Sequence, residues 1–413
     1  MNKPERTLYV ADAVRDAVGT DFRPGGVLVE RDPLRVVAVG SPESLAGGGE
    51  VVRLEGRLLL PAMVNAHAHL ELTSLGRRAY EAEGGFFGWV EMLRGMAEGL
   101  HEKPEAAGSA YRRSVEEGLK QSWAAGVGAI GDIASHEVAA ELRLEAGVLG
   151  VTFLELFGIG APHHDAALAR IARGAPEGVG WQPHAPYSAG QAVYAAAARS
   201  GRPVATHFCE LLEELALVAR GDGACRQFLE RIGRWPGDGE WRYCQGWSPA
   251  YWMEGAMRRT PWLLAHAHYL DDRDVLLLAD TGASVAYCPV AADYFGHPHG
   301  GREGHRYREL LERGVNVCLG TDGLLCQPED EADPLGVWPQ MVRLWERDGA
   351  DAGLLLGMAT VNGARALALD PGLFTFEAGL LAGLASVEIG SNGSGDPLES
   401  ALSGRKRLSM VPV

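Results

Sequence analysis

The chain has 413 residues, of which 46% are hydrophobic and 22% are charged, and its formal net charge is −16. This length and composition are typical of a folded globular protein and exclude a mainly disordered chain. The acidic balance argues against a nucleic-acid partner or an anionic membrane surface, since both bind a basic face.

The N-terminus and the cysteines indicate the compartment. The first residues, MNKPERTLYVADAVRDAV, show no basic region followed by an apolar core, so we expect no signal peptide. No apolar run reaches the length of about 18 residues that a membrane helix needs. The six cysteines form no CxxC pair and no dense disulfide framework. We therefore expect a reduced, soluble, cytoplasmic protein.

The predicted elements divide the chain into three parts. Residues 1–58 contain short apolar segments such as TLYVADAV and GGVLVERD, which predict strands joined by turns. Residues 59–368 alternate apolar runs with amphipathic helical stretches, and residues 369–413 return to strand-like segments. We expect the two terminal parts, 1–58 and 369–413, to form one small β-sandwich.

Eight apolar runs organise the central part, and each ends at glycine or polar residues. They cover residues 58–70, 126–135, 150–158, 178–188, 203–210, 261–270, 282–291 and 315–323. Strands that alternate with helices predict parallel βα units, and eight such units predict an α/β fold with a (β/α)8 TIM-type barrel over 59–368. The alternative is an open doubly wound sheet. That fold usually has a glycine-rich phosphate loop after its first strand, where this chain has NAHAHLELT.

Histidines stand where functional side chains of such a barrel are found, at the carboxyl ends of the strands. The histidines at these strand ends are His67, His69, His184, His207, His266 and His268, and the last strand ends at Asp322. His67 and His69 are two residues apart on a strand, so they point to the same face. Alone, such a pair is more often two hydrogen-bonded core histidines. Together with His207 and Asp322 it offers three imidazoles and a carboxylate, which suit Zn²⁺ or, less selectively, Fe²⁺ or Mn²⁺.

Six motifs in this order resemble the amidohydrolase superfamily, and within it the cytosine deaminase/chlorohydrolase-like branch of metal-dependent deaminases. They are PAMVNAHAHLELT, PHAPYS, THFCE, LLAHAHYL, YCPV and LGTDG. The resemblance covers nearly the whole chain. PHAPYS, followed about 20 residues later by HxxE, particularly resembles enzymes that deaminate purine-like or aminofutalosine-type nucleosides.

The resemblance implies a metal site and a division of labour around it. The metal ligands so implied are His67, His69, His207 and Asp322. By this resemblance a metal-bound hydroxide would attack the substrate, Asp322 would accept the proton of the water, and His266 would orient the hydroxide. Glu210 would carry a proton to the substrate ring. The alternative for Glu210 is a carboxylate that is favoured at a helix N-terminus.

The positions of the lysines indicate how many metal ions the site would hold. Dinuclear relatives use a carboxylated lysine on the fourth strand or an equivalent bridging group. None of the four lysines of this chain lies near residues 178–188. We therefore expect one divalent ion, zinc in the first place, with Fe²⁺ or Mn²⁺ as alternatives.

Two residues are expected to contact the substrate. His184 would donate a hydrogen bond to a hydroxyl or carbonyl group, and the alternative is a structural cap beside two prolines. Trp89 belongs to the aromatic stretch GGFFGWVEML (84–93) and could stack on a planar substrate, and the alternative is a helix that packs its apolar face on the barrel. Whether His268, His297, His299 or His305 contacts the substrate is left open.

The function expected from these residues is hydrolytic deamination of an amino-substituted heterocycle, aminofutalosine-like or purine-nucleoside-like, with release of ammonia. The first alternative is dechlorination or N-dealkylation of a triazine-like ring at the same site. A more remote alternative is a catalytically inactive barrel that binds a partner. We expect a small-molecule substrate and neither a nucleic-acid nor a membrane partner, and a homodimer is left open.

Overall fold

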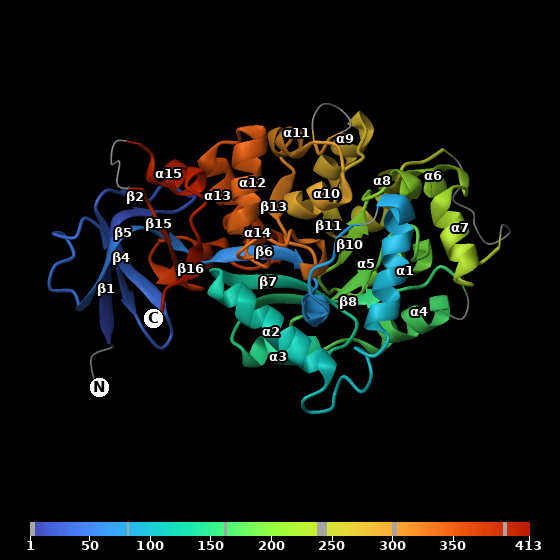
Figure 1. Ribbon diagram of the computed structural model, residues 1–413, viewed down its shortest axis with the longest axis horizontal. Coiled ribbons are helices and arrows are strands. Elements are labelled where there is room, and N and C mark those ends of the chain that lie inside the picture. The colour runs from blue at the N-terminus through green and yellow to red at the C-terminus, as the bar shows by residue number, and fades with distance from the viewer. Residues whose placement is uncertain (1–4, 81, 161–162, 238–245, 300–303, 391–394) are drawn as a thin grey trace.

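The computed structural model describes residues 5–80, 82–160, 163–237, 246–299, 304–390 and 395–413. Its larger part is a barrel of parallel strands surrounded by helices, and its smaller part is a sheet at one end of the long axis (Figure 1). Each apolar run of the sequence overlaps one barrel strand. In the described ranges these strands are β6 (Met63–Ala68), β7 (Val127–Ala134), β8 (Leu149–Leu156), β9 (Val179–Pro183), β10 (Ala205–Phe208), β11 (Leu263–His266), β12 (Ser284–Tyr287) and β13 (Asn316–Leu319).

The barrel closes through two isolated contacts between two four-stranded sheets. The first sheet has the order β6-β7-β8-β9 and the second the order β10-β11-β12-β13. A parallel bridge between Trp181 and Val204 joins β9 to β10, and another between Ala68 and Asp322 joins β6 to the segment that follows β13. The TIM-barrel-like α/β fold predicted from the sequence is therefore confirmed.

The barrel strands are apolar because they are covered on both faces. All residues of β7 are buried, as are all residues of β6 and β9. Parallel strands in such a position form nearly continuous apolar runs. Side chains from most of the strands, including Phe153, Ile133 and Leu263, pack together in one buried cluster. This part of the barrel is a packed core, so a binding site has to lie at the strand ends.

Helices follow the strands along the outside of the barrel. Ser109, Ser248, Asp271 and Asp351 each accept a backbone hydrogen bond in the first turn of a helix, which explains where four of the helices begin. The α-helices are α1 (Gly85–Ala97), α2 (Ala110–Ala124), α3 (Val138–Glu145), α4 (His163–Arg173), α5 (Gln191–Arg199), α6 (Leu212–Arg220), α7 (Ala224–Arg231), α8 (Pro249–Met257), α9 (Asp272–Thr281), α10 (Pro289–Phe295), α11 (Tyr307–Glu312), α12 (Trp338–Asp348), α13 (Ala352–Ala359), α14 (Val361–Ala366) and α15 (Pro397–Ser403). Short 3-10 helices are η1 (Leu70–Leu75), η2 (Ala82–Gly84), η3 (Leu324–Cys326) and η4 (Pro371–Phe374).

The smaller sheet is built from both ends of the chain. Its order is β14-β4-β3-β1-β5-β15-β16, with β2 paired to β1, and the C-terminus lies beside it (Figure 1). β5 runs parallel to β1 and antiparallel to β15, and it continues to Pro61, next to the start of β6. The predicted sandwich and its boundaries at 58 and 369 stay predictions. The strands are β1 (Arg6–Arg15), β2 (Asp21–Phe22), β3 (Gly25–Glu30), β4 (Arg35–Gly40), β5 (Glu50–Pro61), β14 (Gly379–Leu380), β15 (Leu384–Glu388) and β16 (Leu408–Met410).

Two further observations concern the whole of the described chain. None of its helices combines the length and the apolar character that a membrane crossing requires. The five cysteines in the described ranges are buried and free of disulfide bonds, and Cys244 lies outside these ranges.

Candidate active site

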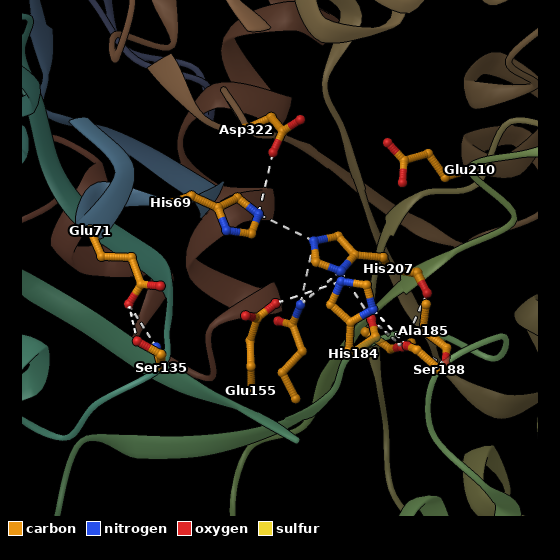
Figure 2. Close-up of polar contacts among 12 residues, drawn as sticks. His69, Glu71, Ser135, Glu155, His184, Ala185, Ser188, His207, Glu210 and Asp322 are labelled. Carbon is orange, nitrogen blue, oxygen red and sulfur yellow. Dashed lines mark hydrogen bonds and ion pairs between the residues drawn. The ribbon is translucent and has the colours of Figure 1, made fainter. Parts of the chain in front are cut away.

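The strand ends bring the predicted metal ligands together. His67 lies on β6, His69 directly follows it, His207 lies on β10, and Asp322 follows β13. Nε2 of His69 lies 3.3 Å from Oδ1 of Asp322 and 3.2 Å from Nε2 of His207. Nε2 of His67 lies 3.7 Å from the same Asp322 oxygen. Figure 2 shows the rings of His69 and His207 facing each other, with Asp322 on the side of His69.

The chemistry of these side chains fits a divalent cation. Nε2 of His67 is buried and has no hydrogen-bond partner among the described residues. Nδ1 of His207 donates to the backbone carbonyl of His184 at 2.9 Å, which leaves the lone pair of Nε2 free for a metal. Burial lowers the pKa of His69 to about 4 and that of His207 well below its usual value, so both rings are neutral bases at neutral pH.

Asp322 completes the ligand set with a negative charge. Burial alone would raise its pKa, but the nearby imidazole rings of His67, His69 and His266 outweigh burial and lower it. The carboxylate is therefore ionised. Three imidazoles and one carboxylate match a four-coordinate Zn²⁺ site, so these residues can hold the ion that the sequence predicts.

Glu210 and His266 form a further pair of ionisable side chains, next to Asp322. Nε2 of His266 lies 3.8 Å from Oε1 of Glu210. Burial, followed by the nearby carboxylates of Asp322 and Glu214, raises the pKa of Glu210 well above its usual value. Glu214 also accepts hydrogen bonds from the backbone N–H groups of Cys209 and Glu210, at 3.0 and 3.3 Å. The raised pKa favours the protonated form of Glu210, and Glu214 holds the backbone at this position.

The backbone at these strand ends is strained. Cys209, His266 and Asp322 have φ values of 47°, 74° and 61°, in the left-handed region that side chains other than glycine rarely adopt. Such residues cost about 1–3 kcal/mol each and persist where the surrounding structure imposes them. Gly320 shows why β13 can come so close to β6, because a Cβ there would lie 2.8 Å from Cβ of His67.

A cavity of about 530 Å³ opens above these residues. His184 and Trp89, the two predicted substrate contacts, both line it. His184 forms a hydrogen bond of 2.6 Å with Ser188 through Nδ1, and its ring stacks on Phe157 with 4.6 Å between the ring centroids. Nε1 of Trp89 donates to the hydroxyl of Tyr294 at 3.0 Å. Their roles in binding stay predictions.

The comparison with known protein families agrees with this geometry. The model of the amidohydrolase family matches residues 58–407, which contain all of the predicted site residues. The chain belongs to the amidohydrolase family. The resemblance seen in the sequence motifs is therefore confirmed.

Individual amidohydrolases and related structures match over most of their length. The 5-methylthioadenosine/S-adenosylhomocysteine deaminase of Haloarcula marismortui is 26% identical over 383 residues, which are 88% of this chain and 80% of the relative. Helicobacter pylori aminofutalosine deaminase, solved with methylthio-coformycin, has a TM-score of 0.74 at 20% identity and 98% and 97% coverage. Atrazine chlorohydrolase from Arthrobacter aurescens, solved with zinc, has a TM-score of 0.71 at 19% identity and 96% and 91% coverage. At these identities the two structures show a shared fold.

Two further carboxylates line the cavity of this amidohydrolase: Glu155, which the sequence analysis missed, and Glu71, whose role the sequence left undecided. Glu155 is the second-last residue of β8, its carboxylate lies 3.9 Å from Nε2 of His184, and burial raises its pKa to about 8. Glu71 accepts hydrogen bonds from the backbone N–H and the hydroxyl of Ser135, at 2.7 and 2.8 Å. Figure 2 shows Glu71 and Ser135 on the opposite side of His69 from Glu210. The signal for Glu155 in the sequence is its place near the end of the third apolar run, where a carboxylate interrupts apolar residues.

Three other histidines form a second buried cluster behind His266. The ring centroids of His268 and His297 are 4.3 Å apart, and Nε2 of His305 donates to the backbone carbonyl of His266 at 2.7 Å. His305 also stacks on Tyr287 with 3.7 Å between ring centroids. None of these three histidines lines the cavity formed by the described residues. His299, the fourth histidine left open by the sequence, is exposed and lies 3.2 Å from Asp293.

Proposed function

We propose that this amidohydrolase deaminates an adenosine-like nucleoside by metal-dependent hydrolysis and releases ammonia. The observation that carries the proposal is the buried Glu210, which lines the cavity beside His266 and next to the proposed metal ligands. A volume of about 530 Å³ falls within the range of about 300–1,000 Å³ that is usual for small-molecule sites. The matching relative that is named for its action on 5-methylthioadenosine and S-adenosylhomocysteine supports the same substrate class.

The proposed metal is one zinc ion, with Fe²⁺ or Mn²⁺ as alternatives. It would be held by His67, His69, His207 and Asp322. When bound, such an ion supplies a water molecule whose pKa is lowered toward neutrality. The neutral imidazoles and the ionised carboxylate described above are the protonation states that such binding requires.

The chain's own residues carry the proton movements. Asp322 takes a proton from the attacking water, and the water oxygen forms a bond to the ring carbon that bears the amino group. Glu210 donates its proton to the neighbouring ring nitrogen, and His266 stabilises the negative charge that develops on the adduct. The proton taken by Asp322 then passes to the amino group, the carbon–nitrogen bond breaks and ammonia leaves. The hydroxyl proton of the adduct returns to Glu210 as the carbonyl group of the product forms. His184 and Trp89 orient the nucleoside from the cavity wall.

The test is ammonia release from 5′-methylthioadenosine, adenosine and a chlorotriazine. We expect ammonia from the nucleosides, and we expect Glu210→Gln to lower turnover by about 10²–10⁴-fold with the metal retained, because a proton donor is lost at unchanged size. Glu213→Gln, an exposed carboxylate on α6, is the matched control and should keep the parental rate. Chloride release without deamination would establish the triazine alternative. A parental rate in Glu210→Gln would contradict the mechanism, and no turnover of any compound would support the inactive barrel.

The remaining proposals concern the surroundings of the enzyme. A small-molecule substrate in the cytoplasm, with no nucleic-acid or membrane partner, is consistent with the net charge of −16. The homodimer stays open.

A further inference from the structure

The side chain of His266 is placed by its backbone and by ring packing. Its ring stacks on that of His207 with 5.6 Å between the centroids, and it meets the ring of His67 edge-on at 5.3 Å. Within the described ranges its ring nitrogens make no hydrogen bond with the protein, and Nε2 lies 3.8 Å from Oε1 of Glu210. The direction of this imidazole therefore depends on how the backbone of His266 is held.

That backbone is strained at two consecutive residues. His266 has a φ of 74° and Ala267 has a φ of 56°, so both lie in the left-handed region. Residues other than glycine rarely adopt this conformation, and it persists where the surrounding structure imposes it. Rotation of the peptide group between the two residues would change ψ of His266 and φ of Ala267. This peptide group therefore controls the conformation at both positions.

Both polar groups of the 266–267 peptide are hydrogen-bonded. Its N–H group, on Ala267, donates to the backbone carbonyl of Phe208 at 2.8 Å, next to the pairing of β10 with β11. Its carbonyl, on His266, accepts a hydrogen bond of 2.7 Å from Nε2 of His305. The first contact comes with the barrel itself. The second comes from a side chain 39 residues further along the chain.

The surroundings of His305 place its proton on Nε2. The buried ring stacks on Tyr287 of β12 with 3.7 Å between the centroids and 15° between the planes, and the hydroxyl of Tyr287 accepts a hydrogen bond of 2.8 Å from Arg347. Burial lowers the pKa of His305 to about 3, so the ring is neutral at neutral pH and has a single N–H group. Nδ1 has no partner in the described chain, whereas Nε2 faces a carbonyl oxygen, so Nε2 is the donor.

The next residue attaches the same segment to the same connection. Nη1 of Arg306 donates to the backbone carbonyl of Leu270 at 3.1 Å, and Nη2 pairs with Asp272 at 2.7 Å. Leu270 lies between β11 and α9, and Asp272 is the first residue of α9. Residues 305–306 are therefore bonded to both ends of the connection that follows His266.

We propose that His305 is a positioning residue for His266. Its Nε2–H group holds the 266–267 peptide in the strained conformation and so directs the imidazole of His266 toward Glu210 and the cavity. His305 itself is outside the cavity lining, so it acts only through His266. The inference rests on the proposed function, in which His266 stabilises the charge that develops on the adduct. It gives a role to one member of the second buried histidine cluster, which the proposed reaction otherwise leaves unused.

Three substitutions separate the hydrogen bond from the packing of the ring. His305→Phe keeps a ring that can stack on Tyr287 and loses the donor, and His305→Met also loses the donor while its flexible side chain can fill the same space. His305→Gln keeps an N–H donor at a similar distance from the backbone. The control is His297→Phe, because His297 belongs to the same buried cluster and its ring bonds to Tyr269. We would measure kcat and KM for 5′-methylthioadenosine, metal content and Tm, and would solve crystal structures of the parent and of His305→Phe.

We expect His305→Phe and His305→Met to lower kcat by about 10–100-fold, because a small displacement of a group that acts in the transition state slows the reaction. KM and metal content should change by less than about twofold, because binding contacts and metal ligands stay in place. His305→Gln should recover much of the loss, and His297→Phe should keep the parental kcat even where its Tm falls. In the crystal structure of His305→Phe, the 266–267 peptide should rotate and the distance of 3.8 Å between His266 and Glu210 should change.

Three outcomes would overturn the proposal: a parental kcat in both variants without the donor, an equal loss of kcat in His297→Phe, or a His266 that keeps its place in the crystal structure of His305→Phe. A parent protein that deaminates no nucleoside would overturn the proposed function instead. The crystal structures would then still decide whether His305 positions His266.

Discussion

The two histidine clusters of the barrel have similar burial and different surroundings. The front cluster consists of His67, His69, His207 and His266, and the rear cluster of His268, His297 and His305. Burial is the main cause of a lowered pKa for His69, His207, His266 and all three members of the rear cluster. Both clusters also contain ring nitrogens without a hydrogen-bond partner in the described chain.

The difference lies in carboxylates and access. The front cluster shares its space with Asp322 and Glu210, and three of its members line the cavity. The rear cluster is packed against Tyr269 and Tyr287 and does not reach the cavity. In the described ranges, every group of three or more side chains close enough to share a cation contains a front-cluster histidine, and none contains a rear-cluster histidine. Buried histidines alone therefore do not make a metal site. A carboxylate within reach and an opening to the cavity are what set the front cluster apart as the candidate site.

The largest expected effect is on metal content, and it tests whether only the front cluster binds an ion. The parent protein should hold about one divalent ion per chain. His207→Ala should lose the ion and the activity, because it removes an imidazole ligand, whereas His297→Ala should keep the ion. Elemental analysis of protein purified without added metal measures this. Two equivalents in the parent, or loss of metal in His297→Ala, would contradict the distinction between the clusters.

A smaller effect separates metal ligands from substrate contacts within the cavity. His184→Ala should lower kcat/KM for a nucleoside, by an amount that corresponds to a loss of about 1–3 kcal/mol in transition-state stabilisation. The loss should be much smaller for the free base if the group that His184 binds is on the sugar. Metal content should not change, because His207 donates to the backbone carbonyl of His184, which alanine retains. Ser188→Ala, which removes only the hydrogen bond to Nδ1, should have a weaker effect. Equal losses on nucleoside and base would make His184 a structural residue.

The smallest expected effect is on the pH dependence of folding stability, and it concerns the rear cluster. Burial, followed by the charge of His299, lowers the pKa of His297 to about 4. Between the usual histidine pKa of about 6.5 and this value, the unfolded chain binds a proton that the folded chain does not, so stability falls as the pH falls.

One such histidine contributes a slope of about 1.4 kcal/mol per pH unit to the free energy of unfolding in this window. His297→Gln should reduce the slope by that amount, and His164→Gln, partly exposed on α4, should leave it unchanged. Urea unfolding at a series of pH values gives the slopes. An unchanged slope in His297→Gln would show that the rear cluster accepts protons while folded.

The sequence predicted the barrel and the metal-ligand set because both depend on local patterns. Each buried strand is an apolar run, and each ligand lies at the end of such a run, as with His67 and His207. The positions of Arg94 and Arg234 in the cavity lining could not be predicted in this way. Arg94 lies on α1 and Arg234 follows α7, and only the packing of α1 against α7 shows that these arginines line the cavity while Arg231 pairs with Glu91.

The histidines left open illustrate the same limit. His297 and His305 are close in the sequence to a glycine-rich stretch, a composition that is typical of an exposed loop. Both are buried, because the chain folds back so that His305 reaches the backbone of His266. A contact between residues about 40 positions apart leaves no periodic signal in either segment.

The strand order of the small sheet has a consequence for protein synthesis. β5 lies between β1 and β15, so one of its edges is covered only when residues 384–388 pair with it. During translation β1 to β5 emerge from the ribosome first, the barrel follows, and β15 emerges near the end. The edge of β5 thus stays open to pairing with other chains for most of the time that translation takes. A protein chain truncated before residue 384 would leave that edge open permanently. We expect such fragments to aggregate even where their barrels have folded.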